Sequence, residues 1–486
     1  MREESPAHIE KRHLKESKEL SKRLVELNRP KPKLYVFYLF LIVCLAYVID
    51  EIASVVTIQI QANIVTEFFV DGMAMNYGQG LSSYQAFCYV ILPFLALGFF
   101  YKPLADKYGR KPFLVINTLF LGTGMFIVYS SNDFFTYMVG LTFIEFFVMH
   151  DIHNVYIMEV SDPKRRGTTF GVTKFFAVLG TLLIPLSKLL FMNDGDHRSW
   201  HNILLIPAIC GLVVSFLALL FARETDPFLK ERIAYLSMSD EERRAQKSRD
   251  KEAGAQGGLI NATKLCFHHR QLFWILVAAG CFYVASVVTS NYSGVMKECA
   301  KMSENDITIA LFAYPIGNAF MQLFSGLLSD AKGRKPMVVT MSSLAILFYV
   351  LFTCSAIYGW NPIIVGLSIG GFVGSYWSAG DTIGGIMLGE SVPTNLRSSV
   401  ATVQTFVFAI FGNLGTLFFI IVQPYVSLSI LPWLYLIWAA PGMVFAILVL
   451  ILKVGETKGV DIEDITGGEW DQRNPGSLEE RTKTID

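Results

Sequence analysis

The chain has 486 residues, of which 52% are hydrophobic and only 17% are charged. Its 41 basic and 41 acidic side chains cancel, and its mean hydropathy is +0.44. Soluble globular chains carry about 25% charged residues, so this chain has unusually few. Its high apolar content excludes a disordered chain, and its zero net charge excludes a nucleic-acid binder. We expect an integral membrane protein whose seven cysteines, which mostly lie in apolar runs, are core residues.

Twelve apolar windows are long enough to cross a bilayer as helices, which takes about 20 residues each. The windows are 34–60, 84–104, 112–131, 134–159, 168–191, 202–222, 271–294, 306–328, 336–357, 362–389, 399–424 and 431–454. The charged residues 1–33 carry no cleavable signal peptide. Apolar residues at helical spacing predict an amphipathic helix there, either on the membrane surface or solvated. Those residues are Ile9, Leu14, Leu20, Leu24 and Leu27.

Lysine and arginine are concentrated in alternate loops. Neither residue occurs in 61–83, 131–136, 355–363 or 424–432. Basic residues instead occupy 1–33, 102–111, 164–166, 223–270 and 332–335. By the positive-inside rule, both termini are expected in the cytoplasm.

A long loop at 223–270 separates the first six windows from the last six. Ser239 and Glu242 have the spacing of a capping box, which predicts a short charged helix within this loop. The predicted organisation is then a cytoplasmic N-terminal segment, two six-helix bundles joined by a cytoplasmic connector, and a cytoplasmic tail. Their ranges are 1–33, 34–222, 223–270, 271–454 and 455–486.

Three short motifs occur twice, once in each half of the chain. Ala105–Pro112, with the sequence ADKYGRKP, recurs as Ser329–Pro336, with the sequence SDAKGRKP. Glu159–Arg166 recurs loosely as Glu390–Arg397. Arg223–Asp226 recurs as Gly455–Lys458. Motif pairs in the same order and at nearly constant spacing indicate a duplication, the architecture of many secondary transporters.

With these doubled motifs, the chain resembles the major facilitator superfamily over residues 33–465. It is most similar to the branch of sugar porters, organic ion transporters and bacterial metabolite–proton symporters. Gly455–Gly459, followed by Asp461–Ile465, resembles the PETKG segment of sugar porters without its first proline. The resemblance implies an all-α fold of twelve helices in two pseudo-symmetric bundles, alternating access and a monomer. The short 61–83 loop resembles bacterial inner-membrane symporters rather than animal organic ion transporters, which carry a large insertion there.

The repeated loops predict a pair of cytoplasmic latches. Acidic residues at the ends of helices 2, 4, 8 and 10 would pair with nearby arginines, and these pairs would break when the transporter opens inward. The predicted latch residues are Asp106, Arg110, Glu159, Arg166, Asp330, Arg334, Glu390 and Arg397. The alternative is that these charges only anchor the loops by positive-inside topology.

Ionisable side chains inside the windows cost about 2.5–3.5 kcal/mol each on insertion scales, so each of them requires a role. On helix 1, Asp50 lies on a polar stripe with Ser54, Thr57 and Gln61, and Glu51 lies about 100° away. A buried carboxylate can exchange protons near neutral pH, which makes Asp50 the first candidate proton carrier. The alternative is a pair between Asp50 or Glu51 and a basic group that only ties helices together.

Helix 4 carries Glu145, His150, Asp151 and His153, and the resemblance implies that helices 1, 4, 7 and 10 line the central cavity. Sugar porters have an arginine and several glycines in this helix, which this chain lacks. His150, His153 and Asn154 would share one helix face. We consider a proton relay, a His-Asp-x-His metal site, and histidines that bond neighbouring helices. The predicted proton-coupling residues are Asp50, Glu51, Glu145, His150, Asp151 and Asp381.

Lys174 is the most informative position for the substrate. It follows Arg166-Gly167 at the spacing at which sugar porters carry a glutamine that bonds sugar hydroxyls. A lysine suits a carboxylate better than a hydroxyl, which favours a small organic anion taken up with protons. If instead Glu145, Asp151 or an acid of helix 1 neutralises Lys174, a cation or a neutral solute is favoured. The other predicted substrate contacts are Gln61, Tyr283, Asn291, Tyr314, Tyr376, Trp377, Gln404 and Asn413.

The sequence has no phosphate-binding P-loop and no soluble catalytic domain, so it predicts neither an enzyme nor an ATP-driven pump, and no cofactor or metal. The expected partners are a small-molecule substrate, protons and the lipid bilayer. The rival hypotheses are an uncoupled facilitator and a sugar or organic-cation transporter of the same fold. A sensor is disfavoured, because the connector is too short for a signalling domain.

Overall fold

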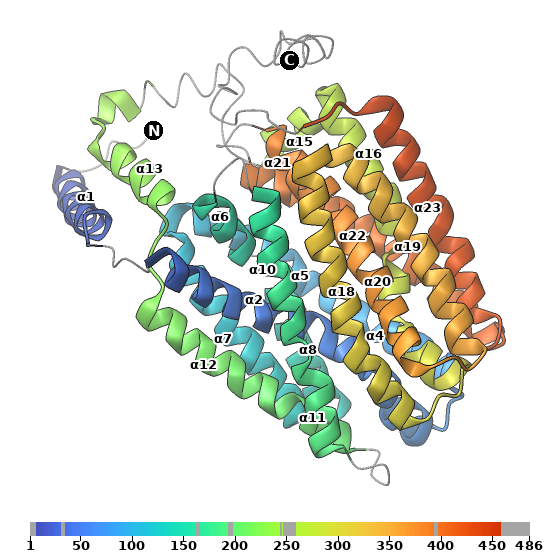
Figure 1. Ribbon diagram of the computed structural model, residues 1–486. Helices are drawn as coiled ribbons and strands as arrows, with labels where there is room; N and C mark the ends of the chain where they lie inside the picture. The colour runs from blue at the N-terminus through green and yellow to red at the C-terminus, as the bar shows by residue number, and fades with distance from the viewer. Residues whose placement is uncertain are drawn as a thin grey trace.

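The computed structural model is all-helical, with the described chain folded as two helical halves that lie side by side (Figure 1). The structure describes residues 6–30, 35–150, 152–161, 166–192, 198–243, 245, 259–392 and 397–457. Within these ranges some side chains are not described, namely those of 6–13, 35–36, 99, 102–103, 106–107, 158, 166, 231, 259–261 and 397–398. In this part of the chain, eleven helices are long and apolar enough to cross a membrane. The two halves are the two helical bundles expected from the duplicated motifs.

The N-terminal part of the chain begins with a helix at residues 6–27, which lies outside the bundle (Figure 1). Its elements are α1 (Pro6–Leu27), α2 (Tyr35–Gln59), α3 (Gln61–Val65), η1 (Thr66–Asp71), α4 (Tyr77–Cys88), η2 (Tyr89–Ile91), α5 (Leu92–Ala96), α6 (Gly98–Tyr108), α7 (Arg110–Tyr129), α8 (Phe134–Val148), α9 (Ile152–Val160), α10 (Arg166–Gly180), α11 (Leu183–Phe191), η4 (Ser199–Leu204) and α12 (Leu205–Phe221). The connector begins with α13 (Asp226–Ser237).

The C-terminal half repeats the same plan with fewer interruptions. Its elements are α15 (Leu259–His268), α16 (Arg270–Tyr283), η5 (Val284–Ser290), α17 (Tyr292–Gly294), η6 (Val295–Cys299), α18 (Glu304–Lys332), α19 (Arg334–Ile357), α20 (Pro362–Asp381), η7 (Thr382–Met387), α21 (Leu388–Glu390), α22 (Arg397–Val422), η9 (Gln423–Tyr425) and α23 (Leu431–Lys453).

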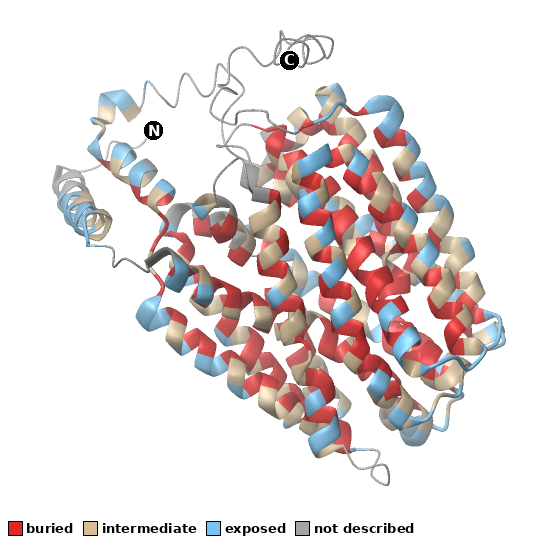
Figure 2. Cartoon of the chain, viewed as in Figure 1, coloured by how far each residue is buried: buried red, intermediate tan, exposed pale blue. Residues whose placement is uncertain are grey.

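Each half has its own cluster of buried hydrophobic residues, one drawn from residues 39–222 and the other from residues 262–454. Buried residues follow the inward sides of the helices, and exposed ones gather on the outer sides and in the loops (Figure 2). Large apolar side chains such as Phe216, Leu347 and Ile437 are exposed on this outer surface. Such a surface is expected where lipid tails, rather than water, surround the helices.

Two expectations about the helices need correction. The second window, 84–104, is not one helix but a succession of short ones, α4, η2, α5 and α6, and it is therefore absent from the eleven long spans. The stretch 61–83 is mostly helical rather than a loop, because α3 and the π-helix η1 extend the first span past a break at Ile60. Windows of hydropathy do not detect such changes of backbone pitch.

The connector contains the capping box predicted from its sequence. The amide of Glu242 donates to Ser239 Oγ at 3.2 Å, and the amide of Ser239 donates to Glu242 Oε2 at 2.7 Å. The N-terminal segment is helical as predicted, but α1 packs against the connector helix α13. The apolar residues Leu14 and Leu24 of α1 remain exposed.

Candidate functional site

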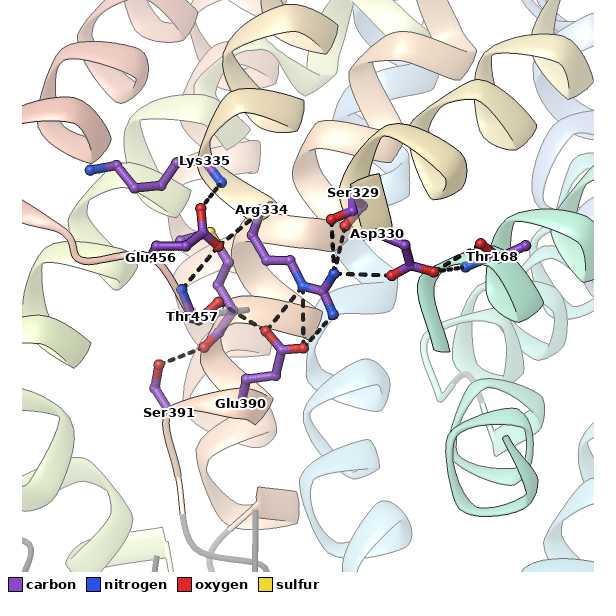
Figure 3. A network of polar contacts seen from close by, with 10 residues as sticks. Thr168, Ser329, Asp330, Arg334, Lys335, Glu390, Ser391, Glu456 and Thr457 are labelled. Carbon is purple, nitrogen blue, oxygen red and sulfur yellow. Dashed lines mark hydrogen bonds and ion pairs between the residues drawn. The ribbon is translucent and has the colours of Figure 1, made fainter. Parts of the chain in front are cut away.

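The predicted latch of the C-terminal half is assembled around Arg334 (Figure 3). Its guanidinium donates to Glu390 through Nη2 at 2.6 Å and through Nε at 3.2 Å, and to Asp330 Oδ1 through Nη1 at 3.1 Å. Asp330 in turn accepts bonds from the amide and hydroxyl of Thr168, at 2.6 and 2.8 Å. Since Thr168 belongs to α10, this network joins the two halves of the molecule.

The N-terminal half has a matching pair at the equivalent position. Arg110 donates to Glu159 Oε1 through Nε at 2.9 Å, and its Nη2 lies 2.8 Å from the same atom. The Nη1 group donates to the carbonyl of Ala105 at 2.8 Å, just as Arg334 Nη1 donates to the carbonyl of Ser329 at 3.1 Å. The motifs that are repeated in the sequence therefore make the same contacts in both halves, an arginine–glutamate pair and a bond from the arginine to a helix carbonyl.

The glycines before both arginines allow these turns to be tight. Gly109 and Gly333 have φ values of +111° and +105°, a backbone conformation that side chains disfavour. A Cβ atom at Gly109 would lie 2.1 Å from Glu224 Oε2, and one at Gly333 would lie 2.7 Å from Glu456 Oε2. Each turn thus leaves room for a carboxylate from the end of its own half.

These two carboxylates, Glu224 and Glu456, were not among the predicted latch residues. Glu224 Oε1 accepts the amide of Arg110 at 2.8 Å, and Glu456 Oε1 accepts the amide of Arg334 at 2.8 Å. Burial raises the pKa of Glu224, and the backbone amides that it accepts act in the opposite direction. Both carboxylates lie in the third repeated motif, and this position could have identified them as caps of α7 and α19, the helices that begin at Arg110 and Arg334.

Four predicted site positions cannot be compared with the structure. Asp151 lies outside the described residues, and so do the side chains of Asp106, Arg166 and Arg397. Their roles in proton coupling and in the latches remain predictions.

Three of the charges inside the membrane meet between the halves, around Lys174. Lys174 of α10 is buried, and its Nζ donates to Asp381 Oδ2 at the end of α20. The same Nζ lies 4.0 Å from Glu51 Oε1 of α2, and 5.8 Å from the ring centre of Phe170. Among the described residues, Lys174 therefore pairs with Asp381, which was not one of the partners considered from the sequence, and lies near the helix 1 acid Glu51, which was. Lys174 and Asp381 belong to different halves, so their pairing depends on how the halves are arranged.

Asp50 approaches a histidine of helix 4. Its Oδ2 atom lies 4.0 Å from His153 Nε2, and the His153 ring stacks on Tyr47 at 3.9 Å between ring centres. His150 instead packs against Tyr101 and Phe146, at 4.7 and 4.9 Å. His150 and His153 thus contact different parts of the protein, His150 after the end of α8 at Val148 and His153 within α9.

Glu145 lies in a third place, within electrostatic reach of the hydroxyls of Tyr84 and Tyr137, which are 2.9 Å apart. It does not join the Lys174 cluster in the contacts of the described residues. Among those residues no group of three histidine, cysteine or acidic side chains is arranged to hold a metal ion. Because Asp151 lies outside them, the His-Asp-x-His alternative stays untested.

The predicted substrate contacts separate into groups. Tyr283 accepts a bond from Gln404 Nε2 at 2.8 Å, and Trp377 lies one helical turn before Asp381 on α20. Tyr314 is fully buried and stacks on Tyr292 at 5.6 Å. Tyr376 is a packing residue, since its ring stacks on Phe282 and its hydroxyl donates to the Phe282 carbonyl at 3.1 Å.

The three remaining substrate candidates lie apart from Lys174. Asn291 accepts a bond from Gln85 at 3.1 Å, and the carbonyl of Asn413 accepts one from Tyr89 at 2.9 Å. Gln61 is buried at the start of α3. Asn291 and Gln61 are thus displaced from the charge cluster toward the ends of the helices opposite the latches, which we call the far end.

Polar contacts between the halves close the far end, and sequence reasoning missed them. Glu304 pairs with Lys188 of the other half at 2.8 Å and with Lys297 at 3.1 Å. Two further cross-half bonds join Gln423 to Gln85 at 2.8 Å, and the Ser293 hydroxyl to the Gln59 carbonyl at 3.0 Å. Only the position of Lys188 in an apolar window could have drawn attention to this cluster.

Comparisons with known proteins identify the family of this chain. The family model described as "Sugar (and other) transporter" matches residues 51–467. The glucose transporter GlcP of Staphylococcus epidermidis is 23% identical, over 75% of this chain and 83% of its own length. YwtG of Bacillus subtilis (strain 168), named as a metabolite transport protein, is also 23% identical, over 79% of this chain and 85% of its own.

A solved structure shares the fold at lower sequence identity. The proton:xylose symporter XylE, bound to 6-bromo-6-deoxy-D-glucose, superposes with a TM-score of 0.63 at 17% identity. The match covers 88% of this chain and 98% of that structure.

Proposed function

This chain belongs to the sugar transporter family of the major facilitator superfamily, and we propose that it carries a small organic anion together with protons. As a member of that family it is a multi-pass membrane transporter of small solutes and not an enzyme. Transport would follow alternating access, with the latch end in the cytoplasm, as the basic loops favour. We further propose a bacterial inner-membrane location and a monomer, both from the resemblance described above.

One observation supports this proposal more than any other, namely the bond between Lys174 and Asp381 across the two halves. A buried ammonium needs an anionic partner, and removing one member of a buried ion pair costs about 3–5 kcal/mol. When Asp381 is charged, it is that partner. When Asp381 takes up a proton, the carboxylate of a substrate replaces it, so the anion binds well only together with a proton.

The same exchange of partners explains how the empty transporter returns. Without substrate, Asp381 loses its proton and pairs with Lys174 again, so no unpaired charge has to cross the membrane interior. Glu51, 4.0 Å from the Lys174 ammonium, would balance the cluster while the partners change. Asp50 and His153 would form a second proton site beside it, since either group can hold the proton between them.

A neutral polyhydroxyl solute is the second candidate, and one observation favours it. Lys174 already has a carboxylate partner and therefore does not require an anionic substrate. The relatives named as glucose and polyol transporters are consistent with this alternative. In that case the Lys174–Asp381 pair would only link the halves, and the polar groups near it would bind hydroxyls.

The test is the pH dependence of binding to the purified protein, with radiolabelled monocarboxylates, aromatic acids and sugars as probes. We expect acid binding to weaken as the pH rises, and to lose this pH dependence in Asp381→Asn. Lys174→Gln should abolish acid binding. Asp71→Asn, which makes the same change as Asp381→Asn at an exposed position, should leave acid binding and its pH dependence intact. Sugar binding that survives Lys174→Gln, with no acid binding to the wild type, would establish the second candidate instead.

A further inference from the structure

The N-terminal helix α1 is docked on the connector by paired charges. Glu19 accepts two bonds from Arg232 of α13, through Nε at 3.0 Å and through Nη2 at 3.2 Å. Glu16 pairs with Arg243, just beyond α13, at 2.9 Å. The bonds from Arg232 hold the pKa of Glu19 below its usual value, so the pair is charged at neutral pH. The inward side of α1 is thus complementary to the connector.

Arg23 extends this contact from α1 to the latch of the N-terminal half. Its Nη2 donates to the carbonyl of Tyr108 at 3.2 Å, in the turn that precedes Arg110. Its Cζ lies 5.3 Å from the ring centre of Phe228, and the Cζ of Arg110 lies 5.2 Å from the same ring. Phe228 is buried and belongs to α13, so one aromatic ring joins α1, the connector and the latch arginine.

The connector also holds the latch turn through its first residues. Glu224, which accepts the amides of Arg110 and Lys111, lies two residues before the start of α13. The hydroxyl of Thr225 donates to Glu159, the partner of Arg110. Glu224 and Thr225, which precede α13, therefore restrain Arg110 and Glu159 from separating. The helix α13 is in turn held by its ion pairs with α1.

We propose that α1 is a regulatory clasp that stabilises the closed latch of the N-terminal half through α13 and Phe228. With α1 docked, the latch opens rarely. Release of α1 frees α13, and the latch opens more often. The clasp acts on the rate of conformational change and leaves the Lys174 cluster unaltered, because the described residues of α1 make no bond to the residues there. This inference does not depend on which solute is transported.

The test is hydrogen exchange of the full-length protein in lipid nanodiscs. Arg232→Glu replaces the attraction to Glu19 by repulsion, and Lys22→Glu makes the same change of charge on an exposed position of α1. We expect Arg232→Glu to speed exchange both in residues 16–27 and in the latch turn, residues 108–112, the latter about three- to fivefold. The double variant Glu19→Arg with Arg232→Glu should restore both rates, and Lys22→Glu should change neither.

One result would overturn the proposal, namely faster exchange in residues 16–27 with an unchanged rate in residues 108–112. The helix would then dock on the connector without controlling the latch. If Arg232→Glu fails to release α1, a variant lacking residues 1–29 takes its place. Unchanged exchange of the latch turn in that variant would reject the clasp equally.

Discussion

Single charged residues in three separate clusters are shared between two partners of opposite charge. Lys174 lies between Asp381 and Glu51, Arg334 between Glu390 and Asp330, and Glu304 between Lys188 and Lys297. A residue with two partners can release one of them without becoming an unpaired charge in a low-dielectric environment, which would cost several kcal/mol. Such sharing suits a protein that must break and re-form contacts between helices in every cycle.

The C-terminal latch offers a test at the scale of one residue. Arg334→Gln removes the cation that Glu390 and Asp330 share, and it leaves two carboxylates facing each other. We expect the loss of about 3–5 kcal/mol of interaction to favour the unlatched arrangement. Faster hydrogen exchange in residues 329–335 and 388–392 would show it. Lys332→Gln, an exposed loss of the same charge in the same turn, is the control. Equal exchange in both variants would mean that the pair contributes little to closure.

The sequence predicted which residues carry these charges better than it predicted their partners. The Arg110–Glu159 and Arg334–Glu390 contacts could be expected, because each joins two repeated motifs that lie at the same end of neighbouring helices. The bond between Lys174 and Asp381 could not, since the two residues lie on different halves and nothing local fixes their relative depth. The same reason concealed the far-end pair of Lys188 and Glu304.

At the scale of helices, close approach depends on glycine. Gly366, Gly370 and Gly374 recur every four residues on α20 and face α18. Cβ atoms at these positions would lie 2.1 Å from the carbonyl of Ala310, 2.1 Å from that of Tyr314 and 2.7 Å from that of Asn318. Small residues at this spacing let two membrane helices pack backbone to backbone.

We expect Gly370→Val to destabilise the C-terminal half by at least about 1–3 kcal/mol, the usual cost of overpacking, because the clash is with backbone that cannot rotate away. The measurement is thermal unfolding of the detergent-solubilised protein. Gly385→Ala is the control, since a Cβ atom there meets nothing within 4 Å. A melting temperature of Gly370→Val equal to that of the control would show that α18 and α20 separate at little cost.

Hydropathy predicted where the spans lie, because a run of about twenty apolar residues is stable in a bilayer only as a helix that crosses it. It could not predict their interruptions, such as the π-helices η1 and η7 or the break between α8 and α9. These depend on which backbone groups find partners in the neighbouring helices, and that information is tertiary. The different neighbours of His150 and His153 are of the same kind, since they depend on the packing of helix 4 against other helices.

At the scale of the whole molecule, contacts between the halves occur at three levels. Polar groups close the far end, Lys174 and Asp381 meet in the middle, and Asp330 reaches Thr168 at the latch end. Alternating access requires these levels to open and close in turn. In the proposed mechanism, protonation of Asp381 weakens the middle level, so proton binding would be coupled to the position of the halves.

The most direct measurement of this coupling is proton movement in proteoliposomes loaded with a pH-sensitive dye. Monocarboxylates, aromatic acids, sugars and organic cations would be added in turn, with empty liposomes as a control because undissociated acids cross lipid unaided. We predict internal acidification with an acid pool in the wild type, and none in Asp50→Asn or Asp381→Asn. Tracer uptake of an acid without acidification, or acidification with sugars alone, would contradict proton-coupled transport of an organic anion.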